Sequence, residues 1–379
     1  MPKIVTAMIL SGIIAASLTA CGLLREAAET ETVTVTDTKA ETETEKPTES
    51  ETTEPSPNCK PDTTLDLSGM ENVDVNYLCE IMETYPNLEV LSTGETVISA
   101  EDYVQLCKMN EKVDVISKLD FEGTVLDLSA SEVDISGKTV ADKALFEDVL
   151  SVIPGGMKMV MCDCGYTNEE MGALREKYTG TDFVWRLYLS KWNLRTDDEA
   201  FSVMIYAADT YVPLTSEDIE VLKYCTNLYA LDLGHQDITD LTPIGEITTL
   251  RVLILADNEI TDVTPLGNLK ELQYLELFVN RITDLTPLAQ CTNLVDLNFG
   301  WNRVYDISSI YSLPNIERLW LPTNNVPYSA RESITAAFPN AQIVFEDKDS
   351  VSSGWRTHER YFSMRGMFNN NKYDENFVK

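Results

Sequence analysis

The feature that most constrains the fold of this chain is a 22-residue repeat that runs through residues 228–326. Each of five copies opens on a leucine or isoleucine and has further apolar residues three and five positions later. The opening residues are Leu228, Leu250, Leu272, Leu294 and Ile316. Such a chain presents the same apolar edge once per period. The repeat pattern therefore predicts stacked coils that bury their edges against one another.

A polar residue stands at a fixed place in every copy. Four copies have an asparagine eight residues after the opening residue, at Asn258, Asn280, Asn302 and Asn324, whereas the first copy has Gln236. A second apolar set comes next, as in Ile260, Val263 and Leu266. This period and motif are those of a leucine-rich repeat. We expect an α/β repeat solenoid with a parallel concave sheet, in which each asparagine bonds backbone groups of its own and the adjacent coil.

Two runs also carry a family resemblance. Residues 260–266 read Ile-Thr-Asp-Val-Thr-Pro-Leu, and residues 282–288 read Ile-Thr-Asp-Leu-Thr-Pro-Leu. Both resemble the 22-residue repeats of bacterial internalins and their relatives. The resemblance covers residues 227–326, and it implies a curved solenoid whose concave sheet face grips another protein.

The segments on either side of the five regular repeats are less periodic. In residues 59–226, short apolar runs alternate with helix starts that place a hydroxyl residue three positions before an acid, which caps the helix. These starts are Ser99, Thr167, Thr196 and Thr215, and the strands are expected at residues 65–67, 88–91, 125–128, 157–161 and 184–189. We interpret this half as irregular, helix-bearing leucine-rich repeats. The alternative is a separate α/β domain.

Residues 327–379 lie beyond the repeat. A helix is expected at residues 329–338 and a last strand at residues 342–345. Apolar residues then recur at roughly helical spacing. They are Trp355, Tyr361, Phe362, Met364, Met367 and Phe368. Because the end of an array exposes apolar core, this segment is expected to be a C-terminal cap, with residues 369–379 frayed. A docking helix for a second protein is the alternative.

The N-terminal sequence is typical of an exported and lipidated protein. Residues 1–20 contain Lys3 and an apolar run too short to span a bilayer, as in a secretory signal. Leu18-Thr19-Ala20-Cys21 resembles the lipobox of bacterial lipoproteins, which implies cleavage before Cys21 and acylation of that residue. The alternative is a cysteine that comes after an ordinary signal by chance. We expect a protein held by lipid on the extracellular face of the bacterial cell membrane.

The lipidated cysteine would be followed by a disordered stalk within residues 21–58. Residues 25–57 have no aromatic residue and contain ten acidic against three basic side chains. Such a composition cannot bury enough apolar surface to fold, and like charges extend it to roughly 30 Å on average. A binding tail for a basic partner is the alternative.

Composition and motifs exclude several functions. A formal net charge of −33 argues against nucleic acid, and it leaves the N-terminal lipid as the contact with the membrane. The two histidines, His235 and His358, lie near no metal-like cluster in the sequence, and Gly137-Lys138-Thr139 lacks the upstream glycine of a phosphate loop. Paired acids such as Glu169 and Glu170 fit helix capping better than glycosidase chemistry. We therefore expect no enzyme, no metal and no cofactor.

The cysteines are expected to be structural. Cys225 and Cys291 stand 66 residues apart at the same repeat position. That places them roughly 14 Å from each other, which is beyond disulfide reach. Cys59 with Cys79 is the pair that could form a bridge.

Strand alternation predicts which side chains line the concave face. An aromatic and apolar band with polar flanks is expected to be exposed there and to bind the ligand. Its residues are Ile254, Tyr274, Glu276, Phe278, Asp296, Asn298, Trp301 and Trp320. Exposed aromatic patches usually mark interfaces. The alternative is that some of these residues, Trp320 above all, pack against the C-terminal cap.

Two functions are compatible with an exposed band. The first is a monomeric module for adhesion or recognition that presents its concave face to an unidentified protein ligand. The second is a carbohydrate-binding or envelope-structural lipoprotein, in which the aromatic rings stack on sugars.

Overall fold

The computed structural model describes residues 63–70, 73–203, 212–347 and 354–378, which all belong to one compact unit, Lys60–Lys379. The predicted signal sequence, Cys21, the predicted stalk and Cys59 lie outside the described residues. In the part that is described, no helix has the length and apolar character needed to cross a bilayer.

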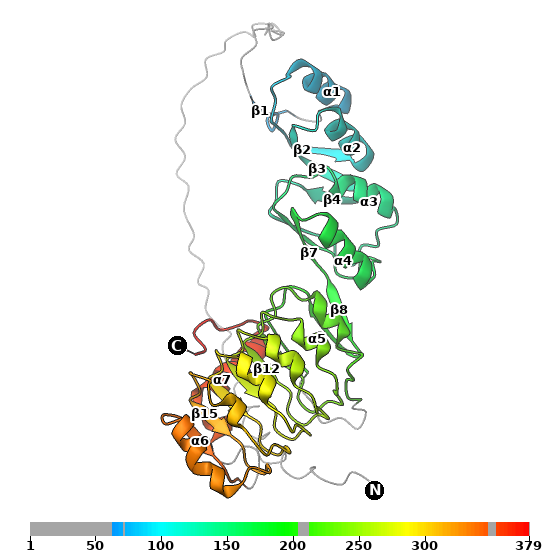
Figure 1. Ribbon diagram of the computed structural model, residues 1–379. Helices are drawn as coiled ribbons and strands as arrows, with labels where there is room; N and C mark the ends of the chain where they lie inside the picture. The colour runs from blue at the N-terminus through cyan, green and yellow to red at the C-terminus, as the bar shows by residue number, and fades with distance from the viewer. Residues whose placement is uncertain (1–62, 71–72, 204–211, 348–353, 379) are drawn as a thin grey trace, which may run out of the picture. The chain divides into compact units, whose positions relative to one another are not determined.

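The regular repeats form the solenoid that the period predicts. Seven strands lie side by side in chain order in one sheet, and every neighbouring pair is parallel (Figure 1). Between β11 and β15 the paired residues differ by 22, as in Leu253 with Leu275. The strands are β10 (Ala200–Ser202), β11 (Ala230–Asp232), β12 (Val252–Ile254), β13 (Tyr274–Glu276), β14 (Asp296–Asn298), β15 (Arg318–Trp320) and β16 (Gln342–Val344). The chain is therefore a leucine-rich-repeat solenoid.

The opposite side of each coil is a short helical turn. Threonine-proline steps open three of these turns, because proline fits the first turn of a helix, where its missing N–H is not needed. A Cβ atom on Gly245 would lie 2.7 Å from Pro265 of the next coil, so only glycine permits this spacing. The turns are η2 (Glu220–Tyr224), α5 (Thr242–Gly245), η3 (Thr264–Asn268), η4 (Thr286–Gln290) and η5 (Ser308–Ile310).

The asparagines make the hydrogen bonds that the motif predicts. Asn280 accepts a bond from the backbone N–H of Ile260 at 3.0 Å and donates to the carbonyls of Leu255 and Leu277 at 2.9 and 3.0 Å. Asn258, Asn302 and Asn324 repeat this pattern. Each side chain thus satisfies buried backbone groups in two coils at once.

The first half of the described chain is built from longer, helix-bearing units. Its sheets are β1-β2-β3-β4, β5-β6-β7 and the hairpin β8-β9. The strands are β1 (Thr64–Asp66), β2 (Val90–Ser99), β3 (Asp114–Phe121), β4 (Thr124–Asp127), β5 (Glu132–Asp134), β6 (Met157–Val160), β7 (Thr181–Val184), β8 (Arg186–Leu189) and β9 (Trp192–Arg195). The helices are α1 (Val75–Thr84), α2 (Ala100–Met109), α3 (Lys143–Leu150) and α4 (Asn168–Lys177).

Two of the four predicted helix starts are confirmed. Ser99 caps α2, and Thr167 caps α4 in a complete capping box with Glu170. The other two predictions were wrong. Thr196 lies in a turn before β10, and Thr215 opens a turn that leads into the 3-10 helix η2. The short motif is the same in all four, so the residues after the motif decide whether a helix forms.

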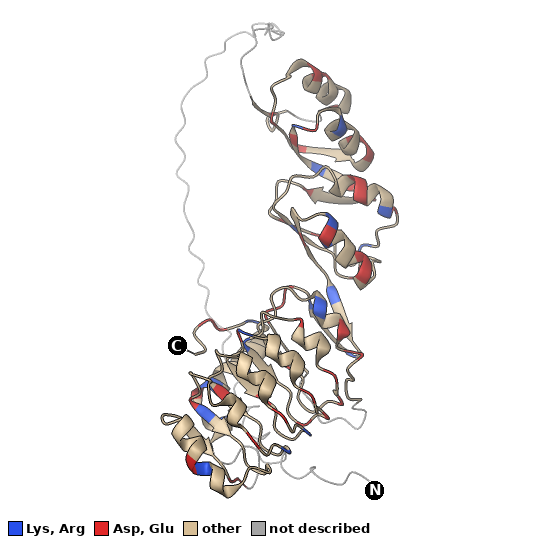
Figure 2. Cartoon of the chain, viewed as in Figure 1, with Lys and Arg blue, Asp and Glu red and all other residues tan. Residues whose placement is uncertain are grey.

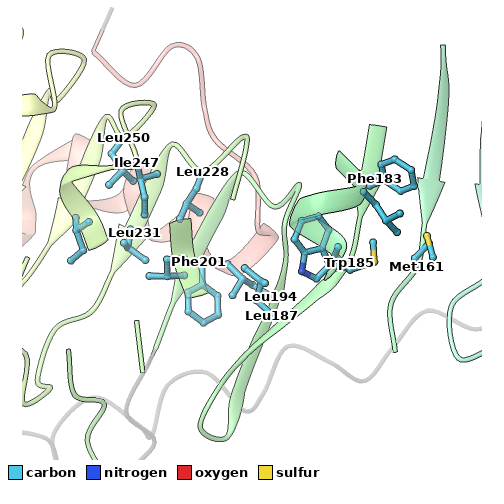
Figure 3. Close-up of a cluster of buried hydrophobic side chains, with 14 of the residues drawn as sticks. Met161, Phe183, Trp185, Leu187, Leu194, Phe201, Leu228, Leu231, Ile247 and Leu250 are labelled. Carbon is cyan, nitrogen blue, oxygen red and sulfur yellow. The ribbon is translucent and has the colours of Figure 1, made fainter. Parts of the chain in front are cut away.

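One apolar core runs through both halves. Its buried residues extend from Leu67 to Phe338. Figure 3 shows the stretch where the two halves meet, with Met161 and Phe183 on one side, Leu228 and Leu231 on the other, and Trp185 between them. The six described cysteines are all free, and Cys291 is fully buried.

The C-terminal residues divide into two parts with different roles. The 3-10 helix η6 (Tyr328–Ala330), α6 (Arg331–Ala337) and β16 continue the array past the last regular repeat, close to where helix and strand are predicted. The 3-10 helix η7 (Trp355–Thr357) and α7 (Glu359–Asn370) instead lie against the sheet. The prediction that this later part caps the array end was therefore wrong. Tyr373 and Phe377, predicted to be frayed, are buried there.

Candidate protein-recognition surface

The outward face of the parallel sheet carries two rows of side chains that point away from the leucine core. Alternation along each strand sends the first and third residues outward, and the register aligns them across the strands. The first row is Ala230, Val252, Tyr274, Asp296 and Arg318, and the second is Asp232, Ile254, Glu276, Asn298 and Trp320. Six of the predicted ligand-binding residues thus share one face.

Residues 354–378 cover this face; we refer to them as the C-terminal segment. Its Trp355 is fully buried, with ring centroids 5.3 Å from Tyr274 and 5.1 Å from Trp320. Phe377 approaches Tyr274 at 5.9 Å. Met364, Met367 and Tyr373 complete a second apolar cluster, which is separate from the leucine core. The outward face is therefore an interior surface of the folded chain.

This coverage corrects the prediction of an exposed aromatic band. Seven of the eight predicted residues are at most 7 % exposed: Ile254, Tyr274, Glu276, Phe278, Asp296, Asn298 and Trp320. Only Trp301 is exposed among the eight, at 40 %. Strand alternation identifies the side of the sheet on which a residue lies, but it carries no information about what covers that side. The alternative in which these aromatics pack against the chain's own C-terminal residues is the correct one.

A buried ion cluster lies beneath the C-terminal segment. Asp296 and Arg318, paired across β14 and β15, form a bidentate ion pair with a 2.9 Å bond from Nε to Oδ1. Arg360 of α7 approaches the same carboxylate at 3.2 Å and also pairs with Glu317 at 2.6 Å. Arg318 also donates to the backbone carbonyl of Trp355 at 3.2 Å. Because buried charges need partners, this cluster fixes the position of α7 on the sheet.

A second polar contact is made by Glu276. Its Oε1 accepts hydrogen bonds from the indole N–H of Trp355 at 2.7 Å and from the hydroxyl of Tyr274. Burial raises the pKa of Glu276, and it also raises the pKa of Asp232 in the same row. The Glu276 carboxyl group in this contact is therefore protonated at a higher pH than an exposed glutamate would be.

The start of α7 depends on a neutral histidine. Burial, with Arg318 and Arg360 close by, lowers the pKa of His358. The unprotonated Nδ1 accepts the backbone N–H of Arg360 at 3.2 Å and so caps the helix.

Two donors on the outward face lack acceptors. Nδ2 of Asn298 and Nε1 of Trp320 are buried without a hydrogen-bond partner among the described residues. They belong to paired positions on β14 and β15. Unmet donors of this kind are costly in a buried site, so the fit between the segment and the sheet is incomplete at this point.

The rim beside the face is formed by residues in an unusual backbone conformation. The residue before each repeat asparagine, or before Gln236 in the first copy, has a φ angle of 54° to 61°. These residues are His235, Asp257, Val279, Trp301 and Thr323. None is glycine, so each strand ends in a left-handed turn that costs some free energy. Trp301 belongs to this rim and is 40 % exposed, whereas Val279, at the same position one coil earlier, packs against the cluster that the C-terminal segment completes.

Sequence reasoning assigned two of the covering residues, Trp355 and Met367, to a cap at the array end and missed Arg360, Tyr373 and Phe377. Trp355, Arg360, Met367, Tyr373 and Phe377 supply the covering contacts. The helical spacing of the apolar residues was a usable signal, but it was assigned to the end of the array. Two polar features of the sequence also indicated this contact. One is Arg360 among those apolar residues, and the other is Asp296 with Arg318 at neighbouring outward positions of the sheet.

Family comparison supports the repeat assignment. A model described as Leucine Rich repeats (2 copies) matches residues 248–290. No curated protein sequence matches the chain.

Several solved structures of repeat proteins resemble this chain. Internalin C2 of Listeria monocytogenes is 30% identical over 41% of this chain and 76% of its own, with a TM-score of 0.31. An internalin F structure from the same species is 18% identical and covers 72% of this chain and 73% of its own, with a TM-score of 0.33. A leucine-rich-repeat protein of Leptospira interrogans is 16% identical, covering 70% and 74%, with a TM-score of 0.30.

Proposed function

We propose that this leucine-rich-repeat solenoid is a lipid-anchored module that recognises a protein segment on the outward face of its parallel sheet. The chain's own C-terminal segment occupies that face in the folded protein. The observation that carries the proposal is this occupancy, because a face that seats an aromatic, arginine-bearing helix has the shape and polarity to seat a similar segment of another protein. Binding, rather than catalysis, is the activity.

The side chains of the C-terminal segment that contact the sheet indicate which side chains a ligand for this face would need. A fully buried tryptophan meets Tyr274 and Trp320, and Arg360 meets Asp296. Tryptophan and arginine are the side chains that most often dominate binding energy at interfaces. The matching partner is therefore a helical segment with an aromatic anchor followed by an arginine.

The charged groups of the outward face would keep partners on the sheet without the segment. Asp296 and Arg318 both belong to the sheet and pair with each other there. Tyr274 and Glu276 likewise hydrogen-bond within one strand. Removing the segment therefore leaves no unpaired buried charge on the sheet, which is the condition for a reusable binding face.

The C-terminal segment and a free peptide would compete for the outward face, and the covalent connection favours the segment. A tethered segment acts at an effective concentration in the millimolar range, so a free peptide of equal intrinsic affinity cannot displace it. Cutting the connection removes this advantage. We expect it to improve apparent peptide binding by about 100-fold.

The test uses the full chain with a specific protease sequence inserted between residues 347 and 354. A fluorescent synthetic peptide of residues 354–379 is added before and after cleavage, and its anisotropy is measured. We expect uptake after cleavage, and weaker uptake of a matched peptide carrying Trp355→Ala and Arg360→Met. If cleavage instead melts the repeats, as measured by circular dichroism, the segment is part of the core and the proposal fails.

The lipid anchor is proposed from the sequence, since Cys21 lies outside the described residues. Acyl chains on Cys21 would tether the protein to the extracytoplasmic side of the cell membrane, because each buried CH₂ adds about 0.8 kcal/mol. Cys21→Ser should move the protein from the membrane fraction to the soluble one and abolish labelling by a fatty acid. Cys59→Ser is the matched control and should change neither result. Unchanged labelling of the Cys21 variant would exclude the anchor.

A further inference from the structure

The sheet formed by β1, β2, β3 and β4 also has an outward face, and within the described residues no element packs over it. The burial of β3 alternates strictly, with Val115, Ser117, Leu119 and Phe121 inside. The alternate residues therefore point outward. They are Asp114, Ile116, Lys118 and Asp120 on β3, with Val90, Ser92 and Val97 beside them on β2 and Val125 on β4.

Four apolar side chains on this face lie outside the hydrophobic core. Val97 is 48 % exposed and Val125 is 55 % exposed. Neither they nor Val90 and Ile116 belong to the hydrophobic core or pack against it. The register places these four residues on three adjacent strands, where they form an apolar strip that is interrupted by their polar partners Asp114, Ser92, Lys118 and Asp120.

Acidic side chains surround the strip. Asp66, Asp114 and Asp120 are exposed, and Glu95 extends from a bulge in β2 (Figure 2 marks the acidic and basic residues of the chain). Lys118, the one outward base on these strands within the described residues, is paired with Glu95 at 2.5 Å. Hydrogen bonds from Ser68 lower the pKa of Asp66, which keeps it charged at neutral pH.

We infer that this face, which we call the valine face, docks a polypeptide that carries lysines or arginines among apolar side chains. The strip supplies the apolar contact and the acidic rim supplies charge complementarity. The chain's own stalk is excluded as the occupant, because ten acids against three bases would be repelled by the rim. This inference does not depend on the function proposed for the other sheet.

The probe for the test is a synthetic amphipathic peptide of alternating lysine and leucine blocks, titrated into the full chain by calorimetry. Val97→Asn with Val125→Asn removes the apolar contact at exposed positions. Asp114→Asn with Asp120→Asn removes two rim charges but keeps the oxygen that Asp120 offers to Gly123. Glu80→Gln with Glu83→Gln on the exposed side of α1 is the control, since it removes the same charge elsewhere.

We expect either valine-face pair to weaken peptide binding by about fivefold to tenfold. The control pair and the native chain should bind alike, and the equivalent peptide with glutamate in place of lysine should not bind. Equal binding by all variants would mean adsorption to a generally acidic surface, and it would overturn the inference, as would an absence of binding to the native chain.

Discussion

At the scale of single residues, the repeat asparagines have an effect on stability out of proportion to their size. Asn280 satisfies one backbone N–H and two backbone carbonyls. Asn280→Ala leaves these buried groups unpaired, so we expect the free energy of unfolding to fall by about 2–4 kcal/mol in urea denaturation. Asn315→Ala, which removes one exposed bond to Thr292, should cost less than about 1 kcal/mol. Equal losses from the two substitutions would contradict this role of Asn280.

A second residue, Glu276, makes stability depend on pH. Its pKa is raised above the ordinary 4.5 because burial penalises the charged form. A raised carboxyl pKa contributes stability that is present at low pH and is lost as the pH rises through the folded-state pKa. We therefore expect Glu276→Gln to reduce the loss of stability between pH 4.5 and neutral pH. Urea unfolding of both proteins across this range measures the difference, and parallel curves would refute it.

At the scale of elements, α7 and the turn before it behave as one unit held by a few anchors. Trp355 is fully buried, whereas Phe362 on α7 is exposed. Trp355→Ala should make the C-terminal segment open more easily by about 3 kcal/mol, because a large buried ring is removed. Hydrogen exchange should then accelerate in residues 355–378 and remain slow in the repeat strands. Phe362→Ala is the control and should leave exchange nearly unchanged; acceleration throughout the array would mean that the segment and the repeats open together.

The same element shows what the sequence can and cannot predict. The repeats were predictable because the period fixes strands, register and the inward leucines such as Leu275. The strand β3 was missed, although its residues alternate apolar and polar. Helical spacing indicated that the apolar residues after residue 354 pack against another surface, but it could not show which surface, since aromatic residues suit an exposed interface and an internal contact equally well. Only the pairing of Arg360 with Asp296 distinguishes the two.

At the scale of the whole molecule, the continuous core couples the two halves through Trp185. Its ring lies 4.1 Å from the Arg175 guanidinium and 5.7 Å from the Tyr224 ring, and its indole N–H donates to Asn168 at 3.0 Å. In repeat proteins, cooperativity depends on such neighbour contacts. We expect the native chain to unfold in one thermal transition and Trp185→Ala to unfold in two, as measured by calorimetry. Tyr188→Ala, on the exposed side of β8, should keep a single transition.

The C-terminal segment also fixes how many coils can lie between its two regions of attachment on the sheet. It is held near β13 to β15 through Trp355 and Arg360, and near β10 and β11 through Tyr373, whose backbone bonds Glu199 and whose ring meets Tyr229. An open solenoid can gain or lose a coil by gene duplication or deletion and still stack. Here an added coil would separate the two attachment points by a further strand spacing of about 4.8 Å, while the segment that joins them stays the same length. Between β11 and β13 the C-terminal segment therefore disfavours changes in repeat number that the repeats alone would tolerate.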